Sequence, residues 1–96
     1  METRILDSDD VTETIALPTL IDAVERAFVA YGRDNVQMPA KSYIELAQYD
    51  GDFRAMPAYV DAEDWEGAAI KWVNSHPNNP ERFDLPTVMG VVIYSD

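Results

Sequence analysis

Three basic side chains lie on segments that we predict to be strands, where a positive charge needs a counterpart. Lys71 stands between Ile70 and Trp72, while Lys41 and Arg54 flank a predicted hairpin turn. A charged lysine among apolar neighbours is costly unless it binds an anion or loses its proton. On neighbouring strands the three cations would converge on one small anion, with Arg54 gripping a carboxylate through two N–H groups and Lys71 moving a proton. The alternative is three unrelated charges, at strand edges or paired with the nearby acids Glu45, Asp52 or Glu66.

Several other kinds of site are excluded by what the sequence lacks. It has no cysteine, which excludes a disulfide framework, thiolate catalysis and cysteine-ligated zinc. Its four glycines are dispersed, so neither a glycine-rich phosphate loop nor a dinucleotide fingerprint is present. His76, the only histidine, is expected to cap backbone groups in its loop beside Pro77. Two acidic clusters lack the spacing of a calcium loop, so no metal site is predicted there: Asp7, Asp9 and Asp10, and Asp61, Glu63 and Asp64.

The net charge of −11, from 18 acidic and 7 basic residues, dominates the composition. So acidic a chain argues against a nucleic-acid backbone as partner. Because 47% of the residues are hydrophobic, we expect a folded protein rather than an acidic tail. The near absence of lysine favours a halophilic source, where concentrated salt screens the self-repulsion of an acidic protein. The alternative is an ordinary acidic domain.

The length of 96 residues predicts a single small domain, residues 1–96, near the size at which a partner helps folding. No apolar run approaches the roughly 20 residues that a membrane-spanning helix needs. The first residues, Met-Glu-Thr-Arg, are not a secretory signal. We therefore expect a cytoplasmic protein that does not engage a membrane.

The elements that must position the three cations are a helix and the strands that follow it. Apolar residues recur at steps of three and four between Leu17 and Tyr31, which predicts an amphipathic helix from Pro18 to Gly32. Pro57 lies inside a strand pattern and indicates a bulge or a sheet edge. A brief helix is predicted at 11–15, and strands are predicted at 4–6, 41–46, 53–60, 67–74 and 87–94.

These elements predict an α/β (α+β) fold, in which the amphipathic N-terminal helix packs on a mixed sheet of about five strands. Its last strand contains the nearly continuous apolar run Val88–Ile93, which is typical of a strand covered on both faces. Little sequence follows to cover it. We therefore expect dimerisation, or further residues, to complete an edge or a face of the sheet.

Four blocks of the sequence, spread in order over essentially the whole chain, resemble the ornithine cyclodeaminase/mu-crystallin family, which includes archaeal alanine dehydrogenases and ketimine reductases. Members bind NAD(P) in a Rossmann domain and small amino or keto acids in an N-terminal α/β domain that also dimerises. The blocks are MPAK at 38–41, FRAMPAY at 53–59, IKWVNSHPNNP at 70–80 and LPTVMG at 85–90.

The resemblance implies roles for the three cations. Lys41 and Arg54 would bind the substrate carboxylate. Lys71 would be the active-site lysine, which polarises the keto or imino group and shuttles its proton. Cyclodeaminases typically carry a glutamate at the position of Arg54, so this arginine favours an amino-acid dehydrogenase or imine reductase.

The resemblance also implies a division of labour. We expect residues 1–96 to be the substrate-binding and dimerisation part of a longer NAD(P)-dependent enzyme of the alanine dehydrogenase type, without the Rossmann domain and inactive alone. This chain would bind no cofactor itself, although the full-length family uses NAD(P). Its partners would be a small keto or amino acid and further copies of itself, as a homodimer or higher oligomer. The alternatives are a stand-alone oligomerising domain without catalysis and a fragment of an ornithine cyclodeaminase.

Overall fold

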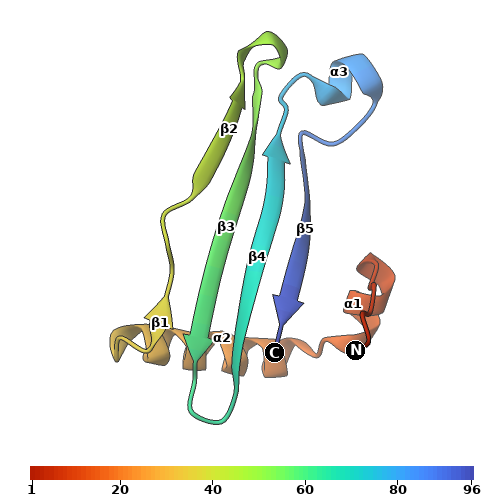
Figure 1. Ribbon diagram of the computed structural model, residues 1–96. Helices are drawn as coiled ribbons and strands as arrows, with labels where there is room; N and C mark the ends of the chain where they lie inside the picture. Colours follow the sequence, from red (N-terminus) through yellow and green to blue (C-terminus); the bar gives the residue numbers. More distant parts are fainter.

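The computed structural model describes residues 1–96 as a five-stranded sheet with one long helix running across its lower end (Figure 1). None of its helices has both the length and the apolar character that crossing a bilayer requires. In chain order the elements are α1 (Ser8–Thr14), α2 (Leu17–Gly32), β1 (Val36–Gln37), β2 (Ser42–Leu46), the 3₁₀ turn η1 (Ala47–Tyr49), β3 (Gly51–Asp61), β4 (Glu66–Ser75), α3 (Asn79–Phe83) and β5 (Val88–Ser95).

The first helix begins at a reciprocal cap. The Asp7 carboxylate accepts a hydrogen bond from the Asp10 N–H at 2.9 Å, and the Asp10 carboxylate accepts one from the Asp7 N–H at 3.0 Å. Two otherwise unpaired donors are thereby satisfied, and both charges sit at the positive end of the helix dipole. The strand predicted at residues 4–6 is wrong, because no strand lies beside this segment and Ile5 is 92% exposed.

Helix α2 covers Leu17–Gly32, as the spacing of its apolar residues predicts. It lies against the sheet only at one end, where Ala30 is buried and the Asp61 N–H donates to the Asn35 carbonyl at 3.0 Å. The helix runs across the strands rather than along them (Figure 1). Most of its apolar side chains therefore stay exposed, with Phe28 at 70%, and the predicted packing on the sheet is limited to that end.

The sheet corrects one detail of the prediction, since it is antiparallel throughout rather than mixed. Parallel neighbours need a long crossover connection. Here each of β3, β4 and β5 starts at the end of the sheet where the strand before it stops, so successive strands run in opposite directions (Figure 1). The α/β class and the number of five strands are confirmed, although β1 (Val36–Gln37) takes the place of the strand predicted at 4–6.

Pro57 lies opposite an interruption in the neighbouring edge, in agreement with its interpretation as a bulge or edge signal. Strand β1 pairs with the end of β3, with Val36 opposite Val60, and β2 pairs with its start, with Ser42 opposite Ala55. Between these pairings, residues 38–41 on the edge face residues 56–58 of β3. The edge segment therefore has one residue more than the part of β3 that it faces, as in a bulge. Pro57 lies in this part of β3, and it has no N–H with which to donate a hydrogen bond to a neighbouring strand.

Alternation along the strands gives the sheet two unlike faces. We call one of them the basic face because it carries Arg54 and Lys71, although Glu45 and Asp52 lie on it as well. Its strand residues are Val36, Tyr43, Glu45, Asp52, Arg54, Met56, Ala58, Val60, Gly67, Ala69, Lys71, Val73, Ser75, Val88, Gly90, Val92 and Tyr94. The opposite, apolar face carries charge only at the β3–β4 hairpin, on Asp61 and Glu66. Its main side chains are Ile44, Phe53, Ala55, Pro57, Tyr59, Ile70, Trp72, Met89, Val91 and Ile93.

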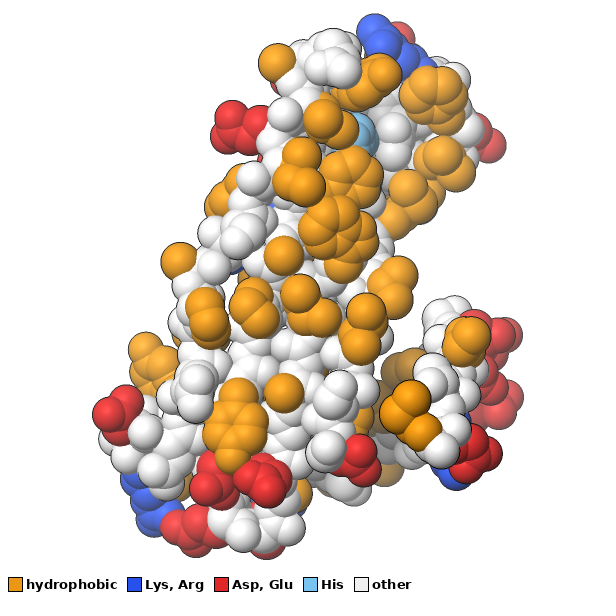
Figure 2. Space-filling view, in the orientation of Figure 1, with side chains coloured by type: hydrophobic (Ala, Val, Ile, Leu, Met, Phe, Trp, Pro, Cys, Tyr) orange, Lys and Arg blue, Asp and Glu red, His pale blue; other side chains and the backbone are white.

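Figure 2 shows the apolar face of the sheet. Its pale-blue atoms belong to the single histidine of the chain, whose ring contacts Phe53 of this face. Hydrophobic side chains run down its middle, and acidic side chains gather at the lower end.

The chain leaves an unusual amount of surface open. Only Ala30 and Asn74 are buried, and the accessible surface is 8015 Å², where a compact chain of this mass exposes about 5,500 Å². The radius of gyration is 16.1 Å, against about 12.5 Å for a compact domain of this length. Most of both sheet faces therefore has no second layer.

Two glycines give a matched test of this packing. A Cβ at Gly51 would stand 2.8 Å from the Ser75 carbonyl oxygen and 2.5 Å from the His76 ring, whereas one at Gly32 would meet nothing within 4 Å. We expect Gly51→Ala to lower the free energy of unfolding by about 1–3 kcal/mol through overpacking. Gly32→Ala, at the last residue of α2, should be neutral or stabilise by up to about 1 kcal/mol. Urea unfolding measures both, and a Gly51→Ala protein as stable as Gly32→Ala would contradict the close approach.

Candidate functional site

Arg54 and Lys71 come from adjacent strands and share the basic face. In the register of β3 with β4, Arg54 lies opposite Val73 and Met56 lies opposite Lys71. The two cations are therefore diagonal neighbours, with backbones about 7–8 Å apart. Ten consecutive residue pairs fix this relation, so it does not depend on a flexible loop.

Lys41 lies beside this pair but outside the ladder. The last paired residue of β2 is Ser42, opposite Ala55. Continuing the same register by one residue would set Lys41 opposite Met56, on the other side of β3 from Lys71. In the structure Lys41 instead belongs to the edge interruption, and its side chain is exposed. The fold thus brings two of the three predicted residues together and leaves the third next to them.

Arg54 is held by an acid of its own strand. Its Nε and Nη2 atoms donate to Oδ1 and Oδ2 of Asp52 at 2.8 and 3.1 Å. The guanidinium also lies over the ring of Tyr43 across the β2–β3 pair, with Cζ 5.4 Å from the ring centroid. Of the nearby acids considered as partners, Asp52 is the one that Arg54 takes. Lys41 and Lys71 form no ion pair, and both are exposed.

The ion pair changes the acidity of both partners. The hydrogen bonds from Arg54 lower the pKa of Asp52, and they outweigh the opposing effect of partial desolvation. The same bonds raise the pKa of Arg54. Asp52 therefore stays ionised and Arg54 stays cationic over the working pH range of proteins.

A second hydrogen bond lies on the apolar face. There the Tyr59 hydroxyl donates to Glu66 at 2.6 Å, which raises the pKa of the phenol.

His76 belongs to a second cluster, at the end of β4. Its backbone N–H donates to the Thr87 carbonyl at 2.8 Å, and its ring contacts Phe53, which stacks on Trp72. The ring Nδ1 lies 2.7 Å from Nδ2 of the buried Asn74, whose Oδ1 accepts the Met89 N–H. Since the Asn74 oxygen is thereby committed, it is the amide nitrogen of Asn74 that faces Nδ1 of His76.

This geometry replaces the backbone-capping role expected for the His76 side chain. The ring hydrogen-bonds to a side chain, Asn74, and packs against an aromatic ring. Sequence reasoning missed Asn74 and Tyr43, and it gave Asp52 only as one of three possible partners of the cations. For Asp52 a signal was present in its two-residue spacing from Arg54, because such residues of one strand share a face. Asn74 stands at the same spacing from His76, which directly follows β4.

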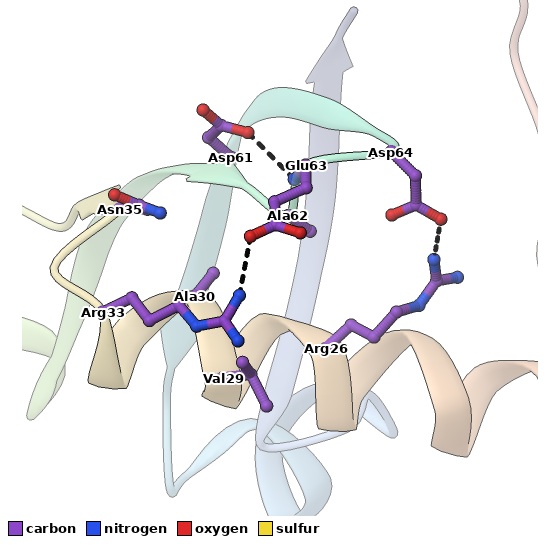
Figure 3. A pocket seen from close by; sticks show the side chains of 9 residues that line it. All are labelled: Arg26, Val29, Ala30, Arg33, Asn35, Asp61, Ala62, Glu63 and Asp64. Carbon is purple, nitrogen blue, oxygen red and sulfur yellow. Dashed lines mark hydrogen bonds and ion pairs between the residues drawn. The ribbon is translucent and has the colours of Figure 1, made fainter.

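Two hollows of the molecule lie away from these cations. One, of about 280 Å³, separates α2 from the β3–β4 hairpin (Figure 3). Arg26 reaches Asp64 across it and Arg33 pairs with Glu63 at 2.6 Å, so both arginines are already neutralised by the hairpin. The other, of about 350 Å³, lies on the apolar face beside the edge interruption. The cations thus occupy an open sheet face, and no group of three acidic or histidine side chains is placed to hold a metal ion.

Comparison with known proteins gives concordant results. The sequence model described as the ornithine cyclodeaminase/mu-crystallin family matches residues 1–96. Alanine dehydrogenase of Archaeoglobus fulgidus is 45% identical over 93 residues, 97% of this chain and 27% of that protein. N-((2S)-2-amino-2-carboxyethyl)-L-glutamate dehydrogenase of Staphylococcus aureus is 28% identical over 80 residues, 79% of this chain and 24% of that protein.

Two solved structures share the fold. An archaeal alanine dehydrogenase dimer with bound NAD superposes with a TM-score of 0.84 and 44% identity, over 100% of this chain and 28% of that one. Thermococcus litoralis Δ1-pyrroline-2-carboxylate reductase, in complex with NADH and L-proline, gives a TM-score of 0.80 and 31% identity over 92% and 26%. The chain therefore spans about a quarter of the length of the relatives it matches.

The Asp52–Arg54 pair predicts a pH dependence with a definite sign. Asp52 has a folded pKa below its ordinary value of 3.8, so the pair stabilises the fold above that pH and is lost as the pH falls through the lower folded value. The ¹³Cγ shift of Asp52, followed by NMR, should titrate with a midpoint below 3.8. Arg54→Met should move the midpoint upward. A midpoint at or above 3.8 in the unmodified chain would contradict the ion pair.

Proposed function

Because the chain belongs to the ornithine cyclodeaminase/mu-crystallin family, we propose that residues 1–96 are the substrate-binding and dimerisation domain of an NAD(P)-dependent oxidoreductase. The substrate would be a small 2-keto or amino acid, as in an amino-acid dehydrogenase or imine reductase of the alanine dehydrogenase type. In support, three of the relatives named above are called dehydrogenases and one is called a reductase, and two are described with bound NAD or NADH.

The observation that carries this proposal is the diagonal pair of Arg54 and Lys71 on one sheet face. Arg54, with Lys41 nearby, would bind the carboxylate of the ligand, because a guanidinium fork matches the two carboxylate oxygens. Lys71 would donate a hydrogen bond to the keto or imino group next to that carboxylate and exchange its proton. The diagonal spacing suits a 2-keto acid, whose two functional groups are directly bonded to each other.

The nicotinamide cofactor does not fit the residues of this chain. A dinucleotide site needs glycines at a strand-to-helix turn where backbone N–H groups meet the pyrophosphate. None of the four glycines here has a positive φ, and the sheet is antiparallel without such a unit. We propose that NAD(P), which supplies hydride transfer when bound, is held outside residues 1–96, and we assign it no contact here.

The apolar face supports the dimerisation part of the proposal. The chain exposes 8015 Å², about 2,500 Å² more than a compact monomer of its mass. A stable interface buries about 800 Å² on each partner. Because this face carries charge only at its hairpin end, on Asp61 and Glu66, the same face of a second copy would cover the uncharged remainder about a two-fold axis. The archaeal structural relative is described as a dimer.

Ligand binding tests the substrate site. We expect pyruvate to bind with a dissociation constant of about a millimolar, because so small a ligand on an open face makes few contacts. Lys71→Met should abolish binding and Arg54→Lys should weaken it, while the fold persists. NMR shift mapping, with chloride replaced by a weakly competing anion, measures this.

The control for the binding test is Arg82→Met, which removes a positive charge from α3, where Arg82 forms no ion pair. Shifts that cluster away from Arg54 and Lys71, or a Lys71→Met chain that binds normally, would refute the substrate site. Dimerisation without any pyruvate binding would favour the stand-alone oligomerising domain.

Assembly is tested by two neighbouring valines on β5. Val91 lies on the apolar face opposite Trp72 and Val92 on the basic face opposite Lys71, with similar exposures of 60% and 63%. Light scattering at tens of micromolar and high salt should give twice the chain mass of 10.8 kDa. Val91→Glu should yield monomers, because it would bury a charge between the apolar faces of the two copies. Val92→Glu should remain dimeric, because its charge would lie on the basic face, outside that interface. A monomeric parent chain, or equal effects of the two changes, would refute this interface.

A further inference from the structure

The contacts of Arg54 leave part of its guanidinium free in a defined way. The group carries five N–H hydrogens, one on Nε and two on each Nη atom. Asp52 takes one from Nε and one from Nη2. Both hydrogens of Nη1 and the second hydrogen of Nη2 remain. One Nη1 hydrogen and the remaining Nη2 hydrogen form a second fork along the end of the group, and this fork also matches a carboxylate.

Three contacts restrict the orientation of that free fork. Asp52 fixes the plane of the guanidinium through two parallel hydrogen bonds, and Tyr43 covers one face of it. The backbone of Arg54 is fixed by pairing with both neighbours, since Arg54 faces Tyr43 on β2 and Val73 on β4. The rotamer freedom of a long side chain is thus already lost before any ligand arrives.

We propose that Asp52 is a positioning residue for the carboxylate site. It grips the side edge of Arg54, so that the end fork is presented in a preformed orientation to a ligand carboxylate. The inference rests on the proposed function of Arg54. It makes Asp52 part of the site although this acid carries the same charge as the ligand.

The competing possibility is that Asp52 occupies the place of the ligand and must leave before the ligand binds. The geometry favours positioning, because Asp52 uses the side edge and leaves the end fork open. The two possibilities predict opposite signs. Removing a competing or merely repelling acid tightens the binding of an anion, whereas removing a positioning acid weakens it.

The experiment compares Asp52→Asn with Glu45→Gln in pyruvate titrations followed by NMR. Glu45 lies directly opposite Asp52 on the same sheet face and forms no ion pair or side-chain hydrogen bond with Arg54, so its change controls for the loss of one negative charge. We expect Asp52→Asn to weaken pyruvate binding about tenfold through lost preorganisation. Glu45→Gln should leave binding unchanged or slightly tighter.

Two further measurements separate positioning from charge and from folding. The Nε–Hε signal of Arg54 should be sharp and protected from solvent exchange in the parent chain and should broaden in Asp52→Asn. Asp52→Glu keeps the charge but moves the carboxylate by one methylene, so it should bind pyruvate about two- to threefold more weakly than the parent chain. It also provides the test if the asparagine variant does not fold.

The outcomes distinguish this inference from the proposed function. If the parent chain binds pyruvate at Arg54 and Asp52→Asn binds it equally or more tightly, the positioning role is overturned and the substrate site stands. Parental affinity in Asp52→Glu would overturn it too, because charge alone would then suffice. If the parent chain shows no pyruvate-dependent shifts near Arg54 and Lys71, the proposed function fails and the positioning role fails with it.

Discussion

The antiparallel pairing of β3 with β4 is the constraint on which the rest of the molecule depends. It runs without a break from Asp52 opposite Ser75 to Asp61 opposite Glu66. A slip of one residue would send every side chain of one strand to the opposite face. Arg54 and Lys71 would then lie on different faces of the sheet, and the stacked pair of Phe53 and Trp72 would be separated. The register thus decides both the chemistry of one face and the apolar character of the other.

Much of this arrangement follows from patterns that are local in sequence. The apolar spacing of α2 gives its bounds within a residue, and Pro57 indicates the broken edge because a missing N–H acts wherever the residue sits. Alternation also puts Lys71 on a face with Ala69 and Val73. The segment at residues 4–6 fails because a strand needs a neighbour, and no local pattern supplies one.

The remaining features depend on contacts between side chains, which sequence spacing leaves open. The sequence offered three acids as partners for the three cations, and only the folded geometry shows that Asp52 accepts two hydrogen bonds from Arg54 while Tyr43 covers the face of its guanidinium. The role of the His76 ring is likewise set by Asn74, whose own orientation is fixed by the Met89 N–H on another strand. How little of the sheet α2 covers depends on its crossing angle, which amphipathicity does not encode.

The two edges of the sheet differ in a way that limits how copies of this chain can polymerise. The outer edge of β3 is occupied by two short strands, β1 and β2, and the gap between them carries Pro39 and faces Pro57. An incoming strand meets no continuous ladder there. The other edge, β5, is eight residues long and has no such break. Each molecule has one β5 edge, so pairing of β5 with β5 joins two copies and then stops.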